Sequence, residues 1–557
     1  MKIYKKLWFL TTVFIATLPY LKGQEEVPFS DLPPLPEGES SLSEQPQVYV
    51  EHFEFTGNTV FSDQVLGEIA KPYQNQELTT EELYELRNQL TRYYIDNGYI
   101  NSGVVLPDQE IIDGVITFKV IEGVLTEKTL SGNKWLKEHY IFSRLERGIN
   151  TPLNIFELQK PLQLLQYHRP IERINAELAP GDALGESVLN IEVKEARPYE
   201  FSTTFNNHRS PSIGSYQLEL SGALSNLTGW GETIGGTYQR RFKEGLGVAP
   251  GQDDYNIYAN IPITRWDTEL QLGFEKNTST VVTDVFRSLD IKSESEIYRV
   301  GLRQPIYRTV SREFAVSIIL ERKKSDTTLL GEPFSFSPGV DNGQSRVTRL
   351  NLVQEWLDRS QQSVLSIRSE IGIGIDALDA TVKDSAEGNS GSDSKFVSWL
   401  GQFQYLRRLP LLDSQLLLRT NVTFVDAPLL PLEKFAIGGY NSVRGYRENA
   451  LNRDEGMTAS VEWRVPIARI KVPMLSKGLA DGEVQLAPFY DYGWGRNKTG
   501  DEGDPRYISS VGIGLRWNIN SRIQTEVYWG HALRNIDFEE HDLQDDGIHF
   551  EFRAALF

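Results

Sequence analysis

The chain of 557 residues carries 57 basic and 76 acidic residues, so its formal net charge is −19, and it contains no cysteine. Without cysteine, disulfide frameworks, zinc–thiolate sites, iron–sulfur clusters and thiol nucleophiles are excluded. A strongly acidic chain is unsuited to neutralising phosphates, so no nucleic-acid partner is expected. The length predicts about two to four domains. A hydrophobic content of 39% argues against wholesale disorder.

The first 23 residues have the composition of a secretory signal peptide. Three lysines precede an apolar run from Leu7 to Leu18, which is too short to cross a membrane comfortably. An uncleaved anchoring helix is the alternative. Residues 24–46 contain five prolines among acidic and serine residues, a composition typical of an extended linker. The sequence therefore predicts a signal peptide at 1–23, a linker at 24–46 and export of the chain.

Residues 47–198 form two predicted α/β modules with the same order of elements, β-α-α-β-β. In the first module, 47–123, the pattern predicts strands and helix starts as follows: strands Val48–Phe55, Ile100–Leu106 and Val115–Ile121, and helices beginning at Ser62 and Thr79. In the second module, 124–198, it predicts strands Thr126–Leu130, Ile171–Leu178 and Val188–Val193, a helix at Leu136–Leu145 and another after Pro152. A repeat of about 75 residues indicates an internal duplication.

Residues 199–557 lack helical periodicity and consist of runs in which apolar and polar positions alternate. In the run 511–517, apolar side chains on one face alternate with Gly512, Gly514 and Arg516. Sixteen such runs begin near Tyr199, Ser215, Glu232, Tyr255, Asp267, Glu294, Arg312, Arg346, Ser363, Phe396, Gln415, Met457, Glu483, Tyr507, Arg522 and Gly547. A strand of about ten residues tilted by about 40° rises roughly 25 Å, the height of the apolar band of an outer-membrane barrel.

The lengths of the connections favour a membrane barrel over a soluble β-sandwich. If the first strand runs outward, each even strand should end in a short periplasmic turn. Short links are predicted after even strands at 358–362, at 518–521 and, with a proline in each, at 260–263, 304–306, 409–411 and 465–467. The connections after odd strands are long, as at 425–456. Because only a closed barrel satisfies every backbone group in lipid, the pattern predicts a transmembrane barrel of sixteen antiparallel strands.

The connection 425–456 contains Val443-Arg444-Gly445-Tyr446, a single arginine among small, apolar and aromatic residues. This composition suits a loop folded into the lumen, with its guanidinium fixed by a carboxylate. Asp491, between Phe489 and Gly493 on the thirteenth predicted strand, is the candidate partner of Arg444, because an Arg–Asp pair can form two parallel charge-assisted bonds. The alternative is an ordinary exposed loop arginine and an unrelated lumen-facing aspartate.

These motifs resemble those of the BamA/TpsB superfamily. Val443-Arg444-Gly445-Tyr446 is similar to the signature of its sixth loop, and Phe489, Asp491 and Gly493 match its Phe-x-Asp-x-Gly strand signature. Several segments resemble the POTRA domains of two-partner secretion transporters: Gly98–Ser102, Leu106–Gln109, Val120–Gly123 and Ala179–Asp182. Residues 47–557 are thus similar to the haemolysin secretion/activation family, ShlB/FhaC/HecB.

The resemblance implies two periplasmic α+β POTRA domains, 47–123 and 124–198, followed by a 16-stranded antiparallel transmembrane β-barrel, 199–557, in the outer membrane of a Gram-negative bacterium. It implies a translocase that recognises an unfolded exoprotein through its POTRA domains and secretes it through the barrel, by type V two-partner secretion. Arg444 would anchor the inward-folded loop, and Asp491 would receive it. The expected partners are a large exoprotein of the haemolysin or adhesin type, outer-membrane lipids and the barrel-assembly machinery. The transporter is expected to be monomeric, without cofactor or metal.

Client recognition is expected by strand addition at an exposed edge of a POTRA sheet, where main-chain hydrogen bonds supply affinity. The candidate edge is the second strand of the first module, with Ile100, Val104, Val105 and Leu106. An ordinary paired or capped strand is the alternative there.

Two other functions compete with secretion. An enzyme has little support, because the chain lacks Gly-x-Ser-x-Gly, a Walker-type loop and metal-ligand spacing among its seven histidines. A factor that inserts other barrels shares the loop and strand signatures, but the secretion-type first module favours a transporter.

The sequence departs from the family pattern at both ends. Residues 24–46 show no helical stripe for the helix that often plugs the pore in this family. Phe557 is one residue out of phase with the outward-facing set that ends at Leu556. This predicts either a bulge near Arg553 or a terminal residue beyond the last pair.

Overall fold

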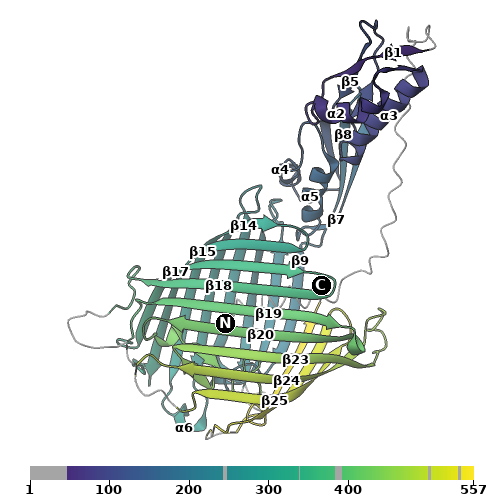
Figure 1. Ribbon diagram of the computed structural model, residues 1–557. Helices are drawn as coiled ribbons and strands as arrows, with labels where there is room; N and C mark the ends of the chain where they lie inside the picture. The colour runs from purple at the N-terminus through teal and green to yellow at the C-terminus, as the bar shows by residue number, and fades with distance from the viewer. Residues whose placement is uncertain are drawn as a thin grey trace. The chain divides into compact units, whose positions relative to one another are not determined.

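The computed structural model describes residues 47–242, 248–337, 339–382, 392–499, 504–536, 538 and 541–556. The predicted signal peptide and linker, 1–46, lie outside the described residues. Of the described residues, 47–197 with Thr228–Gly231 form one compact unit, and the remainder form a second (Figure 1). No helix within the described ranges is both long and apolar enough to cross a membrane.

The first module packs two helices on a three-stranded sheet. Its elements are β1 (Val48–Val50), β2 (His52–Thr56), α2 (Asp63–Ala70), the 3-10 helix η2 (Lys71–Tyr73), β3 (Gln76–Leu78), α3 (Thr80–Asp96), β4 (Gly103–Val105) and β5 (Val115–Ile121). The sheet order is β2-β5-β4, with β5 parallel to β2 and antiparallel to β4, while β1 pairs with β3. The predicted strand Val48–Phe55 is therefore two strands, because its first residues pair with β3 instead of β5.

Helix α3 begins, ends and packs as its local sequence predicts. The Thr79 hydroxyl accepts a hydrogen bond from Glu82 N at 3.2 Å, and the Glu82 carboxylate accepts one from Thr79 N at 2.7 Å, forming a capping box. Residues spaced three or four apart form its buried face: Leu83, Leu86, Leu90 and Tyr94. The helix gives way to a turn at Asn97 and Gly98.

The second module repeats this arrangement around its own apolar core. Its elements are β6 (Val124–Ser131), α4 (Glu138–Leu145), α5 (Ile155–Leu165), β7 (Ile171–Pro180) and β8 (Glu186–Glu195). The sheet order is β6-β8-β7, with β8 parallel to β6 and antiparallel to β7. In both modules the last strand is central, and the strand before it lies at an edge.

The two modules also share one local feature, a glycine-containing turn that is bound by a carboxylate. Gly57 and Gly132 have φ of +82° and +78°, and a Cβ on either would collide with a carbonyl oxygen of the central strand. A carboxylate at the end of that strand accepts backbone hydrogen bonds from the turn that follows the glycine. Glu122 accepts from Thr59 and Val60, and Glu195 accepts from Lys134, Trp135 and Leu136. The repetition of glycine, turn and carboxylate supports an internal duplication.

The second unit is a closed antiparallel β-barrel (Figure 1). Within the described residues, its sixteen long strands are β9 (Tyr199–Asn206), β10 (Tyr216–Ser225), β11 (Thr233–Phe242), β12 (Val248–Pro262), β13 (Glu269–Thr280), β14 (Lys292–Arg308), β15 (Arg312–Leu329), β17 (Gln344–Arg359), β18 (Ser363–Ile375), β19 (Val397–Leu409), β20 (Ser414–Val425), β23 (Glu455–Arg469), β24 (Glu483–Arg496), β25 (Tyr507–Asn518), β26 (Ile523–Ala532) and β27 (Ile548–Ala555). The connections hold the short elements η3 (Pro211–Ile213), α6 (Asp284–Arg287), β16 (Glu332–Pro333) and η6 (Leu411–Asp413). Every predicted strand start agrees to within two residues except that of β12, which begins at Val248 and not at Tyr255.

Side chains alternate between the two faces of the barrel wall. On β25, Ile513 and Leu515 are exposed on the outside, whereas Arg516 is buried inside. On β18, Ile367 is exposed and Arg368 is buried. The outer face is therefore apolar and the inner face polar, which is the distribution that a barrel in a bilayer requires.

Two of the predicted proline links are not turns. Pro305 lies within β14 and Pro466 within β23, and the pairing register shifts beside each. Proline has no N–H for the ladder, so a local irregularity lets the strand continue past it. As a result β14 ends at Arg308, and β23 joins β24 through residues 470–482 and not through a short turn at 465–467.

The last strand continues regularly past Arg553. This residue lies opposite Gln524 on β26 and Thr204 on β9, with no shift of register on either side. The bulge that was one of two alternatives for this strand is absent from the described residues. Phe557 lies outside them.

Candidate functional site in the barrel lumen

The longest connection of the barrel, residues 426–454, joins β20 to β23 and folds back on itself. After the 3-10 helix η7 (Pro431–Glu433), β21 (Phe435–Ile437) pairs antiparallel with β22 (Leu451–Arg453). We call residues 426–434 the loop stem and residues 438–450 the loop tip. The tip carries the predicted motif, and most of its residues are buried.

Arg444 in the loop tip has 1% of its side chain exposed. Its Nε and Nη2 donate to the two oxygens of Asp491 on β24, at 2.8 and 3.0 Å, and its backbone N–H donates to the same carboxylate at 3.0 Å. Its Nη1 donates to Glu462 on β23, and Nη2 also reaches the Ser460 hydroxyl at 3.2 Å. Charge-assisted bonds to two carboxylates thus hold the loop tip on two neighbouring strands.

Two aromatic rings pack on this guanidinium. The Arg444 guanidinium carbon lies 3.6 Å from the ring centroid of Phe489 on β24 and 4.7 Å from that of Tyr528 on β26. A cation is attracted to an aromatic face, and more strongly where water is excluded. Phe489, singled out as part of a strand signature, therefore contacts the arginine directly.

Glycines allow the loop tip to lie close to the wall. Gly445 has φ of +89°, and a Cβ on it would come within 2.8 Å of Gly530 O on β26. The Gly445 N–H donates to His549 Nε2 on β27 at 3.2 Å. At Gly493 on β24, a Cβ would come within 2.8 Å of Val443 Cγ2, so this position must be small to admit the tip.

Val443 and Tyr446 supply apolar packing on either side of the arginine. Val443 is buried in a cluster with Ile508 of β25. The Tyr446 hydroxyl donates to Ser509 O at 3.0 Å and accepts from Arg534 N at 3.1 Å. Each residue of the motif therefore has its own contact that fixes the loop tip.

Several contacts of the loop tip could not be predicted from the sequence. Arg447 forms a bidentate pair with Asp545, in the connection from β26 to β27, with both N···O distances at 2.6 Å. The Tyr440 hydroxyl donates to Glu526 on β26. Alternation does identify Glu462 and Glu526 as lumen-facing. The choice of partner across the lumen depends on strand stagger, which one sequence does not contain.

The predicted client-binding residues of the first module are only partly in a strand. Val104 and Val105 lie in β4, Ile100 lies in the turn after α3, and Leu106 follows the strand. Within the described residues β4 pairs only with β5 and is an edge strand. However, its Val104 side chain is buried in the core, and the Val104 N–H donates to Thr91 Oγ1 of α3 at 3.0 Å. The outer edge is therefore partly capped.

A longer edge lies in the second module. β7 has ten residues and, in the part of the chain that is described, pairs only with β8. The Gln166 side chain caps the first part of its outer edge, by accepting from Ile174 N at 3.0 Å and donating to Glu172 O at 2.9 Å. The residues from Asn175 onward carry no such cap among the described contacts.

Comparison with known proteins gives one consistent result. A family profile described as "Haemolysin secretion/activation protein ShlB/FhaC/HecB" matches residues 185–517, and a ShlB-type POTRA profile matches residues 48–123. The outer membrane transporter CdiB of Dickeya dadantii (strain 3937) is 23% identical over 426 residues, which are 74% of this chain and 72% of that protein. The heme/hemopexin transporter protein HuxB of Haemophilus influenzae is 23% identical over 464 residues, 81% of this chain and 76% of that protein. The solved structure of CdiB from Escherichia coli shares the fold, with a TM-score of 0.67 and 17% identity over 100% of this chain and 97% of that one.

Proposed function

The chain belongs to the haemolysin secretion/activation family, ShlB/FhaC/HecB, and from this premise we propose how its parts carry out secretion. It is an outer-membrane transporter of two-partner secretion, with the barrel in the membrane and the POTRA domains in the periplasm. Its cargo is a secreted exoprotein. The family match favours this function over the insertion of other barrels, which is the activity of the related assembly factors.

The client passes through the barrel lumen as an unfolded chain. The observation that carries this proposal is the inner wall, where charged side chains stand in opposite-charge pairs. Arg368 lies 2.9 Å from Glu355, and Arg299 lies 3.3 Å from Glu275. A wall whose charges are already paired presents little net charge to retain a passing segment of either sign. No covalent step is involved, so the protein acts as a translocase and not as an enzyme.

The loop tip is a fixed part of this passage. The residues of its anchor are Val443, Arg444, Gly445 and Tyr446 on the loop and Phe489, Asp491 and Gly493 on β24. Their dense packing supports this role, because a loop that only filled space would not need two carboxylates and two aromatic rings around one guanidinium.

The unfolded client first binds the POTRA domains by adding a strand to a sheet edge. Main-chain hydrogen bonds make this mode tolerant of client sequence. The ten residues of β7 offer the longer edge, and we assign to it the principal contact. The segment Ile100–Leu106, with Val104 and Val105 in β4, is a second and shorter contact.

The transporter acts as a monomer in contact with outer-membrane lipids, and the host barrel-assembly machinery inserts it. Within the described residues, closure between β27 and β9 leaves the barrel wall itself without an unpaired strand edge for another subunit. The apolar outer face, with residues such as Ile513 and Leu515, suits contact with acyl chains.

A capture experiment tests this function. Residues 47–198 are immobilised and offered the unfolded periplasmic proteins of the host, and the retained proteins are identified by mass spectrometry. Retention of one very large exoprotein through its N-terminal region is the expected result. Retention of many nascent barrel proteins would overturn secretion in favour of barrel insertion.

A further inference from the structure

The loop stem has its own attachment to the lumen wall, apart from the Arg444 anchor. Glu433, the last residue of η7, has 2% of its side chain exposed. Its Oε1 lies 2.8 Å from Lys323 Nζ on β15, and its Oε2 accepts from Arg349 Nη1 on β17 at 2.7 Å. Arg444 binds β23 and β24, so β18, β19 and β20 separate the two attachments along the barrel. The loop is therefore held at two distant parts of the wall.

The loop stem lies against the strand ends that face away from the short turns. Leu429 and Leu430 are buried with Val347, Phe396 and Val425, which are at or beside the ends of β17, β19 and β20. The Leu429 N–H donates to Asp454 at the start of β23, at 3.1 Å. This end of the barrel is the extracellular one, because the short turns are periplasmic.

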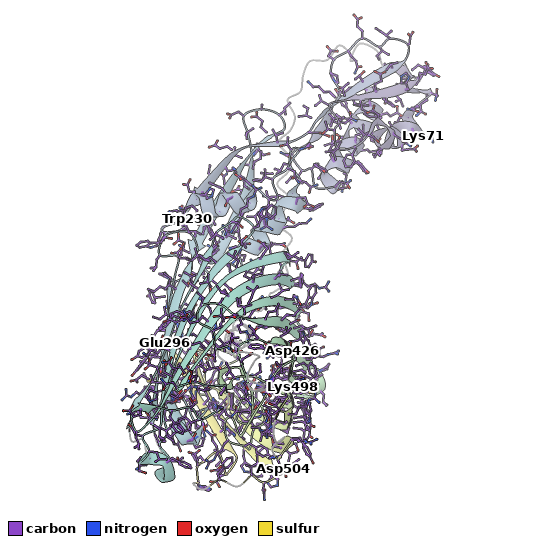
Figure 2. The ribbon with its side chains drawn as sticks, turned by 90° about the vertical axis from the view of Figure 1, so that its left-hand side faces the viewer. Lys71, Trp230, Glu296, Asp426, Lys498 and Asp504 are labelled. Atoms are coloured by element: carbon purple, nitrogen blue, oxygen red, sulfur yellow. The ribbon has the colours of Figure 1, made fainter. Side chains whose placement is uncertain are left out.

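Further contacts continue this arrangement towards β24 and β25. Lys498, in the connection between these strands, donates its backbone N–H to Asp454 at 2.8 Å, and Lys434 of the stem lies 3.4 Å from the same carboxylate. Figure 2 labels Lys498 and also Asp426, the first residue of the stem. The stem thus bridges the strands β15 and β17 on one side and the start of β23 on the other.

Withdrawal of Arg444 would leave a buried charge without a counter-charge. Within the described residues, Asp491 has an ion pair with Arg444 alone, and its side chain is 1% exposed. A buried carboxylate deprived of its partner is strongly unfavourable. The Arg444 attachment is therefore suited to be permanent.

Withdrawal of Glu433 leaves every partner paired. Lys323 retains its ion pair with Glu321, at 3.3 Å, and Arg349 retains its ion pair with Glu370, at 2.6 Å. Glu433 itself would move into water at the extracellular end, where its charge is solvated. The Glu433 attachment is therefore suited to be made and broken.

We propose that Glu433 is a latch, which holds the loop stem across the extracellular mouth of the lumen and releases it when the client leaves. The loop tip stays on β23 and β24 through Arg444, and the stem moves away from β15 and β17. The buried Leu429 and Leu430 make the closed position the resting one. This inference rests on the proposed route of the client through the lumen.

Conductance measures the latch without any client. The purified full chain is inserted into planar lipid bilayers, and Glu433→Gln is compared with the wild type and with Glu332→Gln. Glu332 is an exposed carboxylate on β16, in the connection between β15 and β17, the two strands that Glu433 contacts. It is therefore a matched control. Open events several-fold more frequent in Glu433→Gln, with Glu332→Gln unchanged, are expected. Unchanged conductance of Glu433→Gln overturns the latch whatever the client does.

A disulfide tests the movement of the stem. Asp393 and Leu429 are partners in an isolated β-bridge, close enough for Asp393→Cys and Leu429→Cys to be joined in a chain that has no other cysteine. Oxidation is expected to stop export of the exoprotein and reduction to restore it. Equal export in both states overturns the opening movement of the stem. The lumen route itself is tested separately, by crosslinking of the client from Gln402 on the inside of β19. If the double variant does not assemble a barrel, the latch is tested by the conductance of Glu433→Gln and Glu332→Gln alone.

Discussion

At the residue scale, the charges around Arg444 are shared unequally. Glu462 pairs with both Arg444 and Arg464, whereas Asp491 pairs with Arg444 alone within the described residues. Loss of the arginine would leave Glu462 with a remaining partner and Asp491 with none. Asp491 is therefore the carboxylate that depends on the arginine for its counter-charge.

Arg444→Ala is expected to assemble a normal barrel but to secrete poorly. Removal of one member of a buried pair costs about 3–5 kcal/mol, and here the loss acts on the position of the loop tip and not on the strand ladders. Heat-dependent gel mobility reports the barrel, and the exoprotein in the medium reports secretion. Arg469→Ala, an exposed residue on β23, should behave as the wild type. Normal secretion by Arg444→Ala would remove the anchor role.

Glu122 is expected to give the first module a pH-dependent stability. Burial raises the pKa of Glu122, but hydrogen bonds from Thr59, Val60 and Tyr94 outweigh it and lower the pKa from its usual 4.5. A carboxyl with a depressed folded-state pKa stabilises the fold above its unfolded pKa, and this is lost as the pH falls through the folded value. Glu122→Gln should therefore lower the unfolding free energy at pH 7 by about 1 kcal/mol, as for a capping carboxylate.

Urea unfolding of residues 47–198 at several pH values measures this effect. The difference between Glu122→Gln and wild type should shrink as the pH falls below 4.5, the usual pKa of the group. Glu127→Gln, an exposed position on β6, should show no such difference at any pH. A constant difference for Glu122→Gln down to low pH would contradict the linkage.

At the scale of elements, the contact between the loop tip and β26 depends on the absence of a side chain. Gly445→Ala would strain a φ of +89° and drive a Cβ against the backbone of Gly530. Gly331→Ala imposes similar strain, with φ of +83°, but has nothing within 4 Å of its Cβ. Gly445→Ala should reduce secretion several-fold and expose the tip to added protease, whereas Gly331→Ala should do neither. Equal secretion by the two variants would show that close packing of the tip is not required.

The strands were predictable because each has one face in lipid and one in the lumen, so alternation marks them directly. The exceptions have local causes. Residues 248–254 contain proline, glycine and two aspartates and resemble a turn, yet they belong to β12. Asp253 and Val248 pair with Arg240 and Phe242 of β11 on either side of a register shift, and Arg241 pairs with Asp254 at 2.6 Å. Pro305 and Pro466 resemble strand ends but lie beside register shifts, which a sequence does not reveal.

The candidate site was predictable only in part. A lone arginine in a loop of small and aromatic residues, and one carboxylate in a strand signature, identified Arg444 and Asp491. Glu462 and Tyr528 complete the site from β23 and β26. Their approach depends on how the closed barrel staggers its strands, which is a property of the whole sheet and not of any segment.

At the scale of the whole molecule, each unit contributes a different kind of surface. The duplicated modules present main-chain edges, of which β7 is long and β4 is short. The barrel presents an apolar outer wall and a polar inner wall, to which Arg444 of the loop tip is paired. The proposed recognition by backbone and the proposed passage along paired charges both depend little on client side chains, which suits the export of a large unfolded protein.

The route of the client can be read by crosslinking, because the chain has no native cysteine. Gln402 and Phe403 are neighbours on β19 that face opposite ways: Gln402 donates to Asn421 inside the barrel at 3.3 Å, and Phe403 is 38% exposed outside. A photocrosslinker attached to Gln402→Cys in secreting cells should capture one very large exoprotein, whereas the same probe on Phe403→Cys should not. Failure to capture it from Gln402→Cys while secretion continues, or equal capture from both positions, would contradict passage through the lumen.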